Sequence, residues 1–341
     1  MSGTIRAFVV TGPNAAEVQE VEAPTAGPGH VVIDVQRAGV CGTDVEFFTG
    51  HMPFLHDGNA WFPMRLGHEW MGVVSSVGEG VDPSWVDQRV TGDTMLGCAE
   101  CHRCSSGYQH VCEHRHEVGV RRGWAGALAE QLLMPVRALH PLPDSVSDEQ
   151  GAMVEPGGNA FRAVQGANLS AGDRVLILGP GTIGLLAAMF AQAKGAEVHL
   201  MGRSARSREF ARTFGFDGVW TEDDLPSLRF DAVIDASNGP TMPARAVELV
   251  EPGKRVVYIG LAAVPSLIDS RFLAFKDVTA VGVLSASPAM AETIATFASG
   301  AVDPSLLVAA TVPLGAVGAV LSGERPAGAG QGPKVLVDPR S

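Results

Sequence analysis

Positive charge is scarce in this sequence of 341 residues. Lysine and arginine together number 25, against 37 aspartates and glutamates, so the formal net charge is −12. Proteins that bind nucleic acid usually present a basic surface that displaces counterions from phosphate groups. The composition therefore argues against a nucleic-acid partner.

The sequence also lacks the features of an exported or membrane-inserted chain. Residues 1–10 contain no basic segment followed by a long apolar run and a cleavage site, so we expect a cytoplasmic protein. The uncharged stretch Val175–Ala193 is long enough to suggest a membrane span, but Gly179, Pro180 and Gly184 interrupt it. A buried strand, a turn and a helix explain this stretch better, and we expect no membrane partner.

Long helical periodicity is absent before about Gly157. Short β-like segments separated by glycine and proline occupy this part, namely Arg6–Val10, His30–Ala38, Gly72–Val77, Arg89–Thr91 and Ala129–Met134. This pattern predicts an irregular, β-rich domain.

Beyond residue 170, apolar runs alternate with helical stretches. The apolar runs are Val175–Leu178, Glu197–Met201, Phe230–Asp235, Arg255–Ile259 and Val278–Val283, and the helical stretches are Ile183–Lys194, Ala205–Phe214 and Met242–Val250. Such alternation indicates βαβ units and a parallel sheet covered on both faces. Because Lys334–Val337 is again β-like, we predict an α/β protein with a β-rich domain at 1–157, a doubly wound domain at 158–298, and a return to the first domain at 299–341.

A glycine-rich loop separates the first apolar run from its helix. It reads Gly179-Pro180-Gly181-Thr182-Ile183-Gly184, the GxGxxG pattern of dinucleotide-binding proteins. Gly179 permits a tight turn, Gly181 lets the backbone approach a pyrophosphate, and Gly184 lets helix and strand pack closely. The free N–H groups at the helix start can then bind phosphate, so we expect NAD or NADP. The alternative is a glycine-rich turn without a ligand.

No carboxylate follows the second strand of this domain. NAD-dependent enzymes usually carry Asp or Glu there, which accepts hydrogen bonds from the ribose hydroxyls. Here the residues are Gly202, Arg203 and Ser204, with Arg206 close by. Glycine leaves room for a 2′-phosphate and arginine can pair with it, so the sequence favours NADP over NAD. The alternative is that both arginines are solvated surface charges.

Cysteine is rare, and four of the five cysteines lie close together. They are Cys98, Cys101, Cys104 and Cys112. Four thiolates complete the closed tetrahedral shell of a structural zinc site, which leaves no position open for a substrate. Reduced free thiols or a redox pair are the alternatives. The nearby histidines, His102, His110, His114 and His116, are expected on the surface.

A second set of metal-binding residue types is scattered along the chain. A catalytic zinc needs about three protein ligands and an open position. Cys41 and His68 suit such a site, and Glu69 and Glu155 are the carboxylate candidates. Taken singly, each of these residues is also compatible with a purely structural role.

These motifs together resemble the medium-chain zinc-dependent dehydrogenases, in the branch with alcohol, sorbitol, threonine and archaeal-type glucose dehydrogenases. The resemblance rests on Cys41-Gly-Thr43-Asp44, Gly67-His68-Glu69, the four-cysteine segment, Glu155-Pro156 and Gly179–Gly184, which occur in the family's order. It implies a GroES-like β-rich catalytic domain, a Rossmann domain and a homodimer or homotetramer.

The resemblance also implies roles for the metal-binding candidates. It implies a catalytic zinc on Cys41, His68 and Glu155, while Glu69 matches a glutamate that binds zinc in some members. Asp44 matches the carboxylate that orients the histidine ligand.

Other positions are implied to act in proton transfer or cofactor binding. Thr43 would take the proton of the bound hydroxyl, and Asn159 matches a position that touches nicotinamide. Many alcohol dehydrogenases end the proton relay with a histidine at the position where this chain, like the glucose-dehydrogenase-like members, has Glu46. In this chain we expect Glu46 to pass the proton onward.

The substrate is expected to be a small polar alcohol or its carbonyl counterpart. Residues 51–64 can line the site, with Phe54 and Trp61 as walls and His56 and Asp57 as hydroxyl binders; a lid or an oligomer contact is the alternative. With Glu46, this mixture favours a polyol, sugar or cyclitol. Rival functions are an NADPH-dependent ketone or aldehyde reductase in a biosynthetic pathway and a non-enzymatic zinc-ribbon binding module.

Overall fold

The computed structural model describes residues 3–341, which form two compact units. The first unit contains the chain up to Glu155, together with Met290–Ala298 and Asp303–Ser341; the second contains Pro156–Ala289 and Ser299–Val302. Helix Met290–Ala298 lies within the range predicted for the second domain, but its contacts group it with the first unit.

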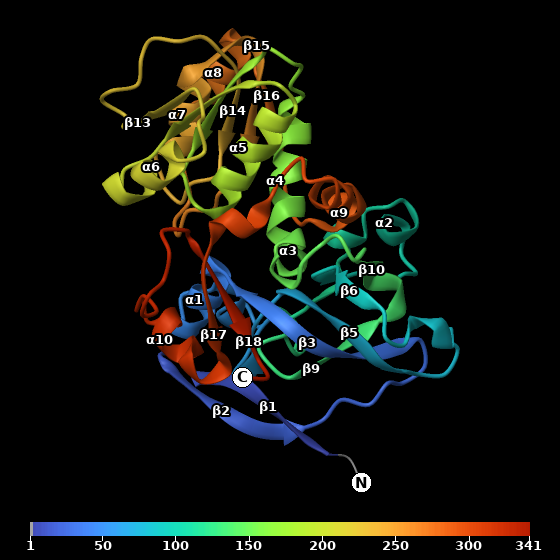
Figure 1. Ribbon diagram of the computed structural model, residues 1–341. Helices are drawn as coiled ribbons and strands as arrows, with labels where there is room; N and C mark the ends of the chain where they lie inside the picture. The colour runs from blue at the N-terminus through green and yellow to red at the C-terminus, as the bar shows by residue number, and fades with distance from the viewer. Residues whose placement is uncertain (1–2) are drawn as a thin grey trace. The chain divides into compact units, whose positions relative to one another are not determined.

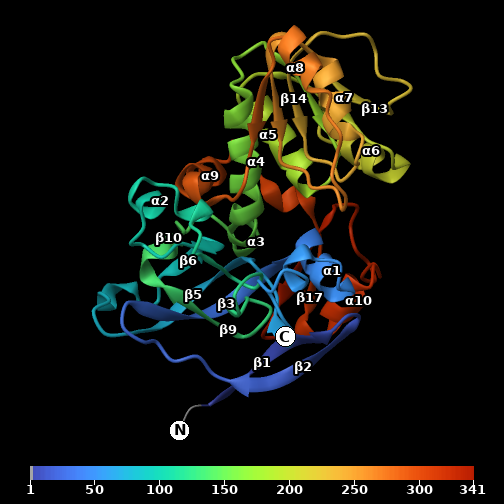
Figure 2. The ribbon, with the colours of Figure 1, turned by 180° about the vertical axis from the view of Figure 1, so that it is seen from behind.

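The first unit is built from β-strands with short helices between them (Figures 1 and 2). Its strands are β1 (Thr4–Gly12), β2 (Ala15–Glu22), β3 (His30–Val40), β4 (Met64–Arg65), β5 (Glu69–Val77), β6 (Arg89–Gly92), β7 (Met95–Leu96), β8 (His116–Glu117), β9 (Gln131–Pro135), β10 (Leu139–Pro141), β17 (Val308–Pro313) and β18 (Lys334–Asp338). Its α-helices are α1 (Gly42–Thr49), α2 (His102–Ser105), α3 (Asp148–Ala152), the start of α4 (Val154–Ala167), α9 (Met290–Ala298) and α10 (Val317–Leu321).

The main sheet of this unit has seven strands, in the order β10-β6-β5-β3-β18-β17 with β9 also pairing with β3. The side chains of Val31, Ile33 and Val35 on β3 are fully buried, because alternate residues of a strand point to the same face. Strand β3 lies between β5 and β18, with Gly39 opposite Glu69 on one side and Val40 opposite Val335 on the other. This register brings the chain's last strand close to the start of β5.

The second unit is a six-stranded parallel sheet in the order β13-β12-β11-β14-β15-β16. Its strands are β11 (Arg174–Leu178), β12 (Glu197–Met201), β13 (Gly218–Trp220), β14 (Phe230–Asp235), β15 (Val250–Tyr258) and β16 (Thr279–Gly282), and its helices are most of α4, α5 (Thr182–Ala193), α6 (Ala205–Arg212), α7 (Met242–Leu249) and α8 (Ser270–Phe275). Strand order proceeds outward in both directions from β11 and β14, so right-handed connections place helices on opposite faces. This sheet confirms the α/β prediction.

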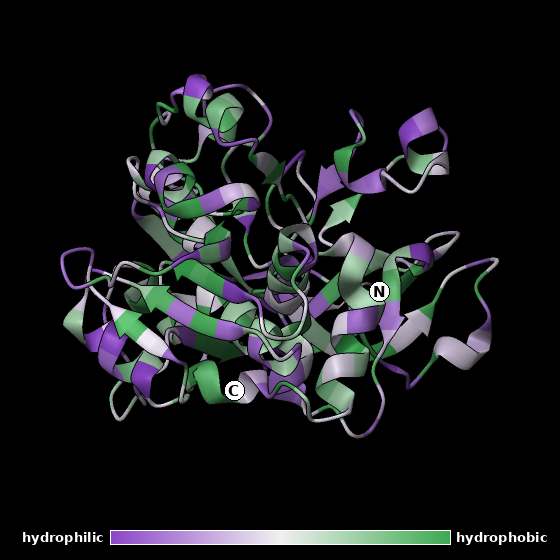
Figure 3. Cartoon of the chain, turned by 90° about the horizontal axis from the view of Figure 1, so that it is seen from above, coloured by the Kyte–Doolittle hydropathy of each residue, from purple (hydrophilic) through white to green (hydrophobic). Residues whose placement is uncertain are grey.

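Burial explains the apolar runs of the second unit. Val175–Leu178 of β11 is fully buried, as expected for a parallel strand covered on both faces. Figure 3 shows hydrophobic and hydrophilic residues side by side on several helices, the pattern of helices with one buried face. The run Val175–Ala193 forms β11, the glycine loop and α5, and within residues 3–341 no helix has the length and apolarity needed to cross a membrane.

Several elements differ from the sequence prediction. Helix α1 lies in the part of the chain that was expected to lack long helices, and α4 begins at Val154, before the expected change at Gly157. Strand β15 was expected to begin at Arg255, but it begins at Val250. Val250 pairs with Phe230, and the register of the pairing with β14 then shifts before Ala232 pairs with Arg255. Helix α1 escaped prediction because its cap is a cysteine, with Asp44 completing the capping box, instead of Ser or Thr.

Candidate active site and metal centres

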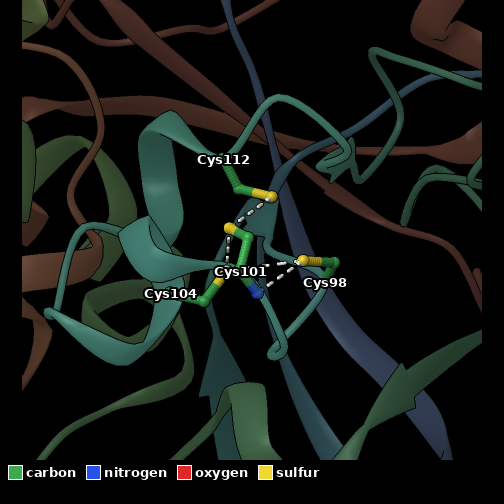
Figure 4. Close-up of side chains that lie close together, drawn as sticks. All are labelled: Cys98, Cys101, Cys104 and Cys112. Atoms are coloured by element: carbon green, nitrogen blue, oxygen red, sulfur yellow. Dashed lines mark hydrogen bonds between the residues drawn. The ribbon is translucent and has the colours of Figure 1, made fainter.

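The sulfur atoms of the four clustered cysteines all lie within 4.8 Å of one another (Figure 4). The Sγ–Sγ distances are 3.9 Å for Cys98–Cys104, 3.6 Å for Cys101–Cys104 and 3.7 Å for Cys101–Cys112. Zinc–sulfur bonds of about 2.3 Å in a tetrahedron place the sulfurs about 3.8 Å apart. The spacing fits a structural zinc and is far too long for a disulfide.

Backbone N–H groups donate to the sulfurs of Cys98 and Cys112, whereas burial raises the pKa of Cys104 to about 12. Hydrogen bonds from the N–H groups of Glu100 and Cys101 lower the pKa of Cys98 to about 6. The backbone N–H of His114 donates to Cys112 Sγ at 3.3 Å. A Cβ atom at Gly97 would lie 2.7 Å from Cys104 Sγ, so only glycine leaves room for that sulfur.

The neighbouring histidines do not all lie on the surface as predicted. His102 and His114 are exposed, but His110 is only 5% exposed, and His116 is half-buried against Trp124. His110 follows Gln109 in a 3₁₀ turn, Gln109–Val111, which turns its ring inward, so the prediction was wrong for this residue.

A second donor set gathers where β3 and β5 meet α1. Donor atoms of Cys41, His68 and Glu69 lie within 4.8 Å of one another. Cys41 follows β3 as the N-cap of α1, and Glu69 begins β5. Thiolate, imidazole and carboxylate are the three ligand types that zinc takes in proteins, so this donor set fits a zinc ion.

Asp44 ties the helix start to the histidine loop. It is fully buried, and its carboxylate accepts hydrogen bonds from the backbone N–H groups of Cys41 at 2.8 Å and Gly67 at 3.3 Å. Asp44 Oδ1 also lies 3.8 Å from His68 Nδ1, a buried atom without a hydrogen-bond partner among the described residues. Burial raises the pKa of Asp44 even though the His68 charge and the Cys41 hydrogen bond act to lower it.

Glu155 lies near this set without belonging to it. Thr94 Oγ1 is 3.1 Å from the His68 carbonyl oxygen and 3.4 Å from Glu155 Oε1, so Thr94 connects the two residues. Burial acts to lower the pKa of His68, but a hydrogen bond with Cys41 and the charges of Asp44, Cys41 and Glu155 raise it well above its usual range. The resemblance implied Glu155 as the third ligand, whereas the structure groups Glu69 with Cys41 and His68.

The expected proton-transfer residues occupy α1. Thr43 is half-buried in its first turn, two residues after Cys41. Burial raises the pKa of Glu46 against the opposing charge of His51. The backbone N–H of His51 also donates to the Glu46 carbonyl oxygen at 2.9 Å, so the two residues lie together at the end of the helix.

Each glycine of the loop Gly179–Gly184 in the second unit has a different structural role. Gly179 has φ = 95°, a conformation that other residues rarely adopt. A Cβ at Gly184 would lie 1.9 Å from the Gly179 carbonyl oxygen, whereas a Cβ at Gly181 would meet no described atom within 4 Å. Gly181 is the N-cap of α5 and makes no side-chain cap hydrogen bond, so the first turn of the helix keeps free N–H groups that can bind a phosphate.

The residues after β12 have additional packing roles. A Cβ at Gly202 would lie 2.5 Å from two ring carbons of Pro180, so packing alone already requires glycine there. Arg203 and Ser204 are exposed, and the Ser204 hydroxyl caps α6. Arg208 donates to the Gly202 carbonyl oxygen at 2.8 Å, a contact that the sequence analysis did not anticipate. Asn159 lies half-buried on α4, in the same unit.

The loop of residues 51–64 is held by a neighbouring segment. Arg121 donates to Asn59 Oδ1 at 3.0 and 2.8 Å and lies over the Phe54 ring, 5.2 Å from its centroid. His56 and Asp57, expected to bind hydroxyls, also have partners within the loop: His56 Nε2 lies 3.1 Å from the Gly50 carbonyl oxygen, and Asp57 Oδ1 accepts from the backbone N–H of Asn59. Trp61 is 54% exposed.

Sequence comparison finds two matching domain families. Residues 27–144 match the model of the alcohol dehydrogenase GroES-like domain, and residues 182–299 match that of the zinc-binding dehydrogenases. The sorbitol dehydrogenase of Halalkalibacterium halodurans is 31% identical over 303 residues, which cover 84% of this chain and 85% of that protein.

Solved structures match nearly the whole chain. The rspB alcohol dehydrogenase of Escherichia coli CFT073, in complex with NADH, has a TM-score of 0.90 at 26% identity and covers 99% of this chain and 100% of that one. A candidate zinc-binding dehydrogenase of Sinorhizobium meliloti 1021, bound to NADP, has a TM-score of 0.89 at the same identity and coverage. The two similar folds thus carry different nicotinamide cofactors.

Proposed function

The chain belongs to the medium-chain zinc-dependent alcohol dehydrogenase family, and from this premise we propose that it moves a hydride between NADP and the carbinol carbon of a polyol, sugar or cyclitol. As a family member it is a zinc-dependent, NAD(P)-linked oxidoreductase that acts on CH–OH donors, which excludes the zinc-ribbon binding module. The observation that carries the proposal is the grouping of Cys41, His68 and Glu69 in a chain that also has the nucleotide loop.

In this proposal Cys41 and His68 hold the catalytic zinc, and a glutamate completes the site. Glu69 and Glu155 both lie near His68, so the third ligand can differ between steps of the cycle. When bound, zinc polarises the substrate oxygen and lowers the pKa of its hydroxyl. Cys98, Cys101, Cys104 and Cys112 hold a second zinc that stabilises their loop.

Residues of α1 handle the proton of the substrate hydroxyl. Thr43 Oγ1 accepts that proton and donates its own onward, and the Glu46 carboxylate, three residues further along the helix, receives it. The raised pKa of Glu46 supports this role, because a general base works best when its pKa approaches the ambient pH. The nicotinamide carries the hydride, and Asn159 contacts its ring.

NADP is favoured because the residues that follow β12 carry positive charge and no carboxylate. Arg203 is exposed, and the adjacent Ser204 caps a helix whose first-turn N–H groups attract anions. The case rests on Arg203 and Ser204 more than on Gly202, since contact with Pro180 already requires glycine there.

A polyol, sugar or cyclitol is favoured by polar groups near the metal donors and by the similarity to a sorbitol dehydrogenase. We infer that the loop of residues 51–64, which Arg121 holds through Asn59 Oδ1, supplies polar groups to a hydroxylated substrate. The reverse reaction, reduction of a ketone or aldehyde by NADPH, uses the same residues.

A homodimer is proposed through the edge of the second unit. Strand β16 ends its sheet, and exposed apolar side chains cluster in the segment before and around it, with Leu261, Leu267 and Phe275 at 79, 89 and 85% exposure. Monomers rarely expose such a patch beside an unpaired strand edge. Ala280→Lys together with Phe275→Asp should convert a dimer to a monomer in sedimentation experiments. We also propose a cytoplasmic location for the protein.

The testing experiment compares NADPH and NADH binding by nicotinamide fluorescence. We expect tighter NADPH binding in the zinc-loaded protein, weakened by Arg203→Ala and little changed by Cys41→Ser. Lys194→Ala, which removes an exposed charge at the end of α5 opposite the glycine loop, is the matched control. A polyol and sugar panel follows with the preferred cofactor. Preference for NADH would remove the NADP assignment alone, while turnover of none of the panel would overturn the proposed substrate class.

A further inference from the structure

A buried ion pair lies beside the proposed catalytic metal ligands. Lys334 Nζ is 2.5 Å from Glu69 Oε2, and the two side chains are only 3% and 2% exposed. Lys334 also donates to the Val40 carbonyl oxygen at 3.0 Å, on the peptide that precedes Cys41. The only lysine of the final strand is therefore bonded both to a metal-ligand candidate and to the backbone next to another.

Fold stability alone is a weak reason to keep this pair. Removing two charges from water costs free energy that their attraction often fails to recover, and apolar replacements of similar size are frequently as stable. The Lys334 Nζ has the Glu69 carboxylate and the Val40 carbonyl as acceptors, so its positive charge is paired beside the donor set.

The backbone is shaped to let the pair form. Gly39 on β3 lies directly opposite Glu69 on β5, and β18 pairs with the other edge of β3. A Cβ at residue 39 would lie 2.0 Å from Glu69 Oε2 and 3.0 Å from its Cβ. The Glu69 side chain therefore crosses β3 over Gly39 to reach Lys334, a route open only because residue 39 is glycine.

The same carboxylate is close enough to serve a metal. A tetrahedral zinc shell with bonds of about 2.0–2.3 Å needs its ligand atoms roughly 3.3–3.8 Å apart. Glu69 offers an oxygen within 4.8 Å of the Cys41 and His68 donor atoms, so a small movement would bring it into that shell. Lys334 and a bound zinc would then compete for one carboxylate.

We propose that Lys334 is a positioning residue that holds Glu69 at the edge of the catalytic zinc shell, so that Cys41, His68 and Glu155 hold the zinc and the fourth metal position stays free for substrate. The inference rests on the proposed function, because it takes these three residues to be the zinc ligands. Without the lysine charge, Glu69 becomes a permanent ligand: it binds the zinc more tightly and blocks the substrate oxygen.

The test measures zinc affinity and steady-state kinetics in Lys334→Met, which keeps the length and bulk of the side chain. The zinc followed is the one that Cys41→Ser removes, titrated with buffered free zinc while the four-cysteine site stays loaded. We expect half-saturation at free zinc on the order of tenfold lower than in the wild type, the scale typical of partners around metal ligands. KM for the alcohol should rise more than kcat falls.

Two further variants separate positioning from a structural role. Lys334→Arg keeps the charge and should stay within roughly threefold of the wild type in zinc affinity. Glu69→Gln and Glu69→Gln/Lys334→Met should bind zinc equally, because Lys334 then has no carboxylate to hold. The double variant Glu69→Gln/Lys334→Met has no unpaired buried charge, so it should fold even if Lys334→Met does not. The comparison of the double variant with Glu69→Gln then still tests the inference.

Unchanged or weaker zinc binding in folded Lys334→Met would overturn the inference, as would an effect of Lys334 that persists in the Glu69→Gln background. If Cys41→Ser leaves the zinc content of the chain unchanged, the proposed catalytic site itself is wrong. A different result would show that only the role proposed for Lys334 is wrong. In that case Cys41→Ser loses the zinc, but Lys334→Met leaves the zinc affinity unchanged.

Discussion

Asp44 Oδ2 accepts a hydrogen bond from the backbone N–H of Cys41 at 2.8 Å, and its other oxygen accepts one from Gly67 at 3.3 Å. One buried carboxylate thus joins the two segments that supply Cys41 and His68. The arrangement makes Asp44 the support of the metal site as well as the cap of α1.

Asp44→Asn is expected to weaken zinc binding and activity by about 10- to 100-fold. The amide keeps one acceptor, but its NH₂ group faces a backbone N–H that needs an acceptor. The measurement is zinc content after dialysis against a chelator, followed by kcat/KM. Asp144→Asn, at an exposed position of the same unit, is the control. Full zinc retention in Asp44→Asn would contradict this support role.

Replacing a cysteine of the four-sulfur group should lower stability without touching cofactor binding. Cys101 is suited to the test, because its sulfur contacts those of Cys104 and Cys112 at 3.6 and 3.7 Å. Cys101→Ala should lose one zinc per chain and lower the Tm, since structural zinc contributes directly to folding free energy. Ser105→Ala, on the exposed side of α2, should change neither quantity. A Cys101→Ala protein that kept its full zinc content would exclude the site.

The glycine loop allows packing and ligand binding to be separated by two alanine substitutions. Gly184→Ala places a Cβ 1.9 Å from the Gly179 carbonyl oxygen and should cost about 1–3 kcal/mol of stability. Gly181→Ala points its Cβ into open space at φ = −89°, so it should leave the Tm unchanged and weaken NADPH binding by roughly tenfold or more.

The comparison uses thermal unfolding without cofactor and fluorescence titration with NADPH. Normal NADPH affinity in Gly181→Ala would mean that the pyrophosphate does not approach this backbone. A large loss of Tm in the same variant would mean that the space beside Gly181 is needed by the protein itself.

The acid stability of the second unit should depend on Glu197. Hydrogen bonds from Arg174 and His199 lower the pKa of Glu197 to about 2, against 4.5 for a free glutamate. A carboxyl with a depressed pKa in the folded state stabilises the fold above its unfolded pKa, and this contribution is lost as the pH falls through the folded pKa. Glu197→Gln should therefore lower the urea midpoint at neutral pH, with the difference shrinking between pH 4.5 and about 2.

Glu209→Gln, on the exposed face of α6, should leave the midpoint close to wild type at every pH. Because the Glu197 side chain is 35% exposed, solvent screening keeps its effect modest. A difference between wild type and Glu197→Gln that stays constant down to pH 2 would show that charge is not the source of the stabilisation.

Chemistry carried by short, contiguous motifs was readable from the sequence. The spacing of Cys98, Cys101 and Cys104 predicted a cluster that the structure places at sulfur separations of 3.6–3.9 Å. The βαβ alternation predicted the parallel sheet, and the resemblance predicted the family. Such signals are local because a turn, a helix start or a metal loop is built by neighbouring residues.

Contacts between distant strands could not be read in this way. Nothing around Lys334 marks it as a partner of Glu69, which lies 265 residues away, because a lysine at the start of a strand usually lies in solvent. The sequence shows that Gly202 stands where NAD-dependent enzymes usually have Asp or Glu. Only the structure shows that Pro180 also excludes any side chain at this position.

The sequence by itself determined the family, the four-cysteine cluster, the candidate ligands of a second metal site and the nucleotide loop. Each of these depends on residue types within short motifs. The tertiary structure alone decided which carboxylate lies with Cys41 and His68, and that Lys334 opposes it across Gly39. The physical reason is that strand register, set by packing over the whole sheet, determines which distant side chains share a buried space.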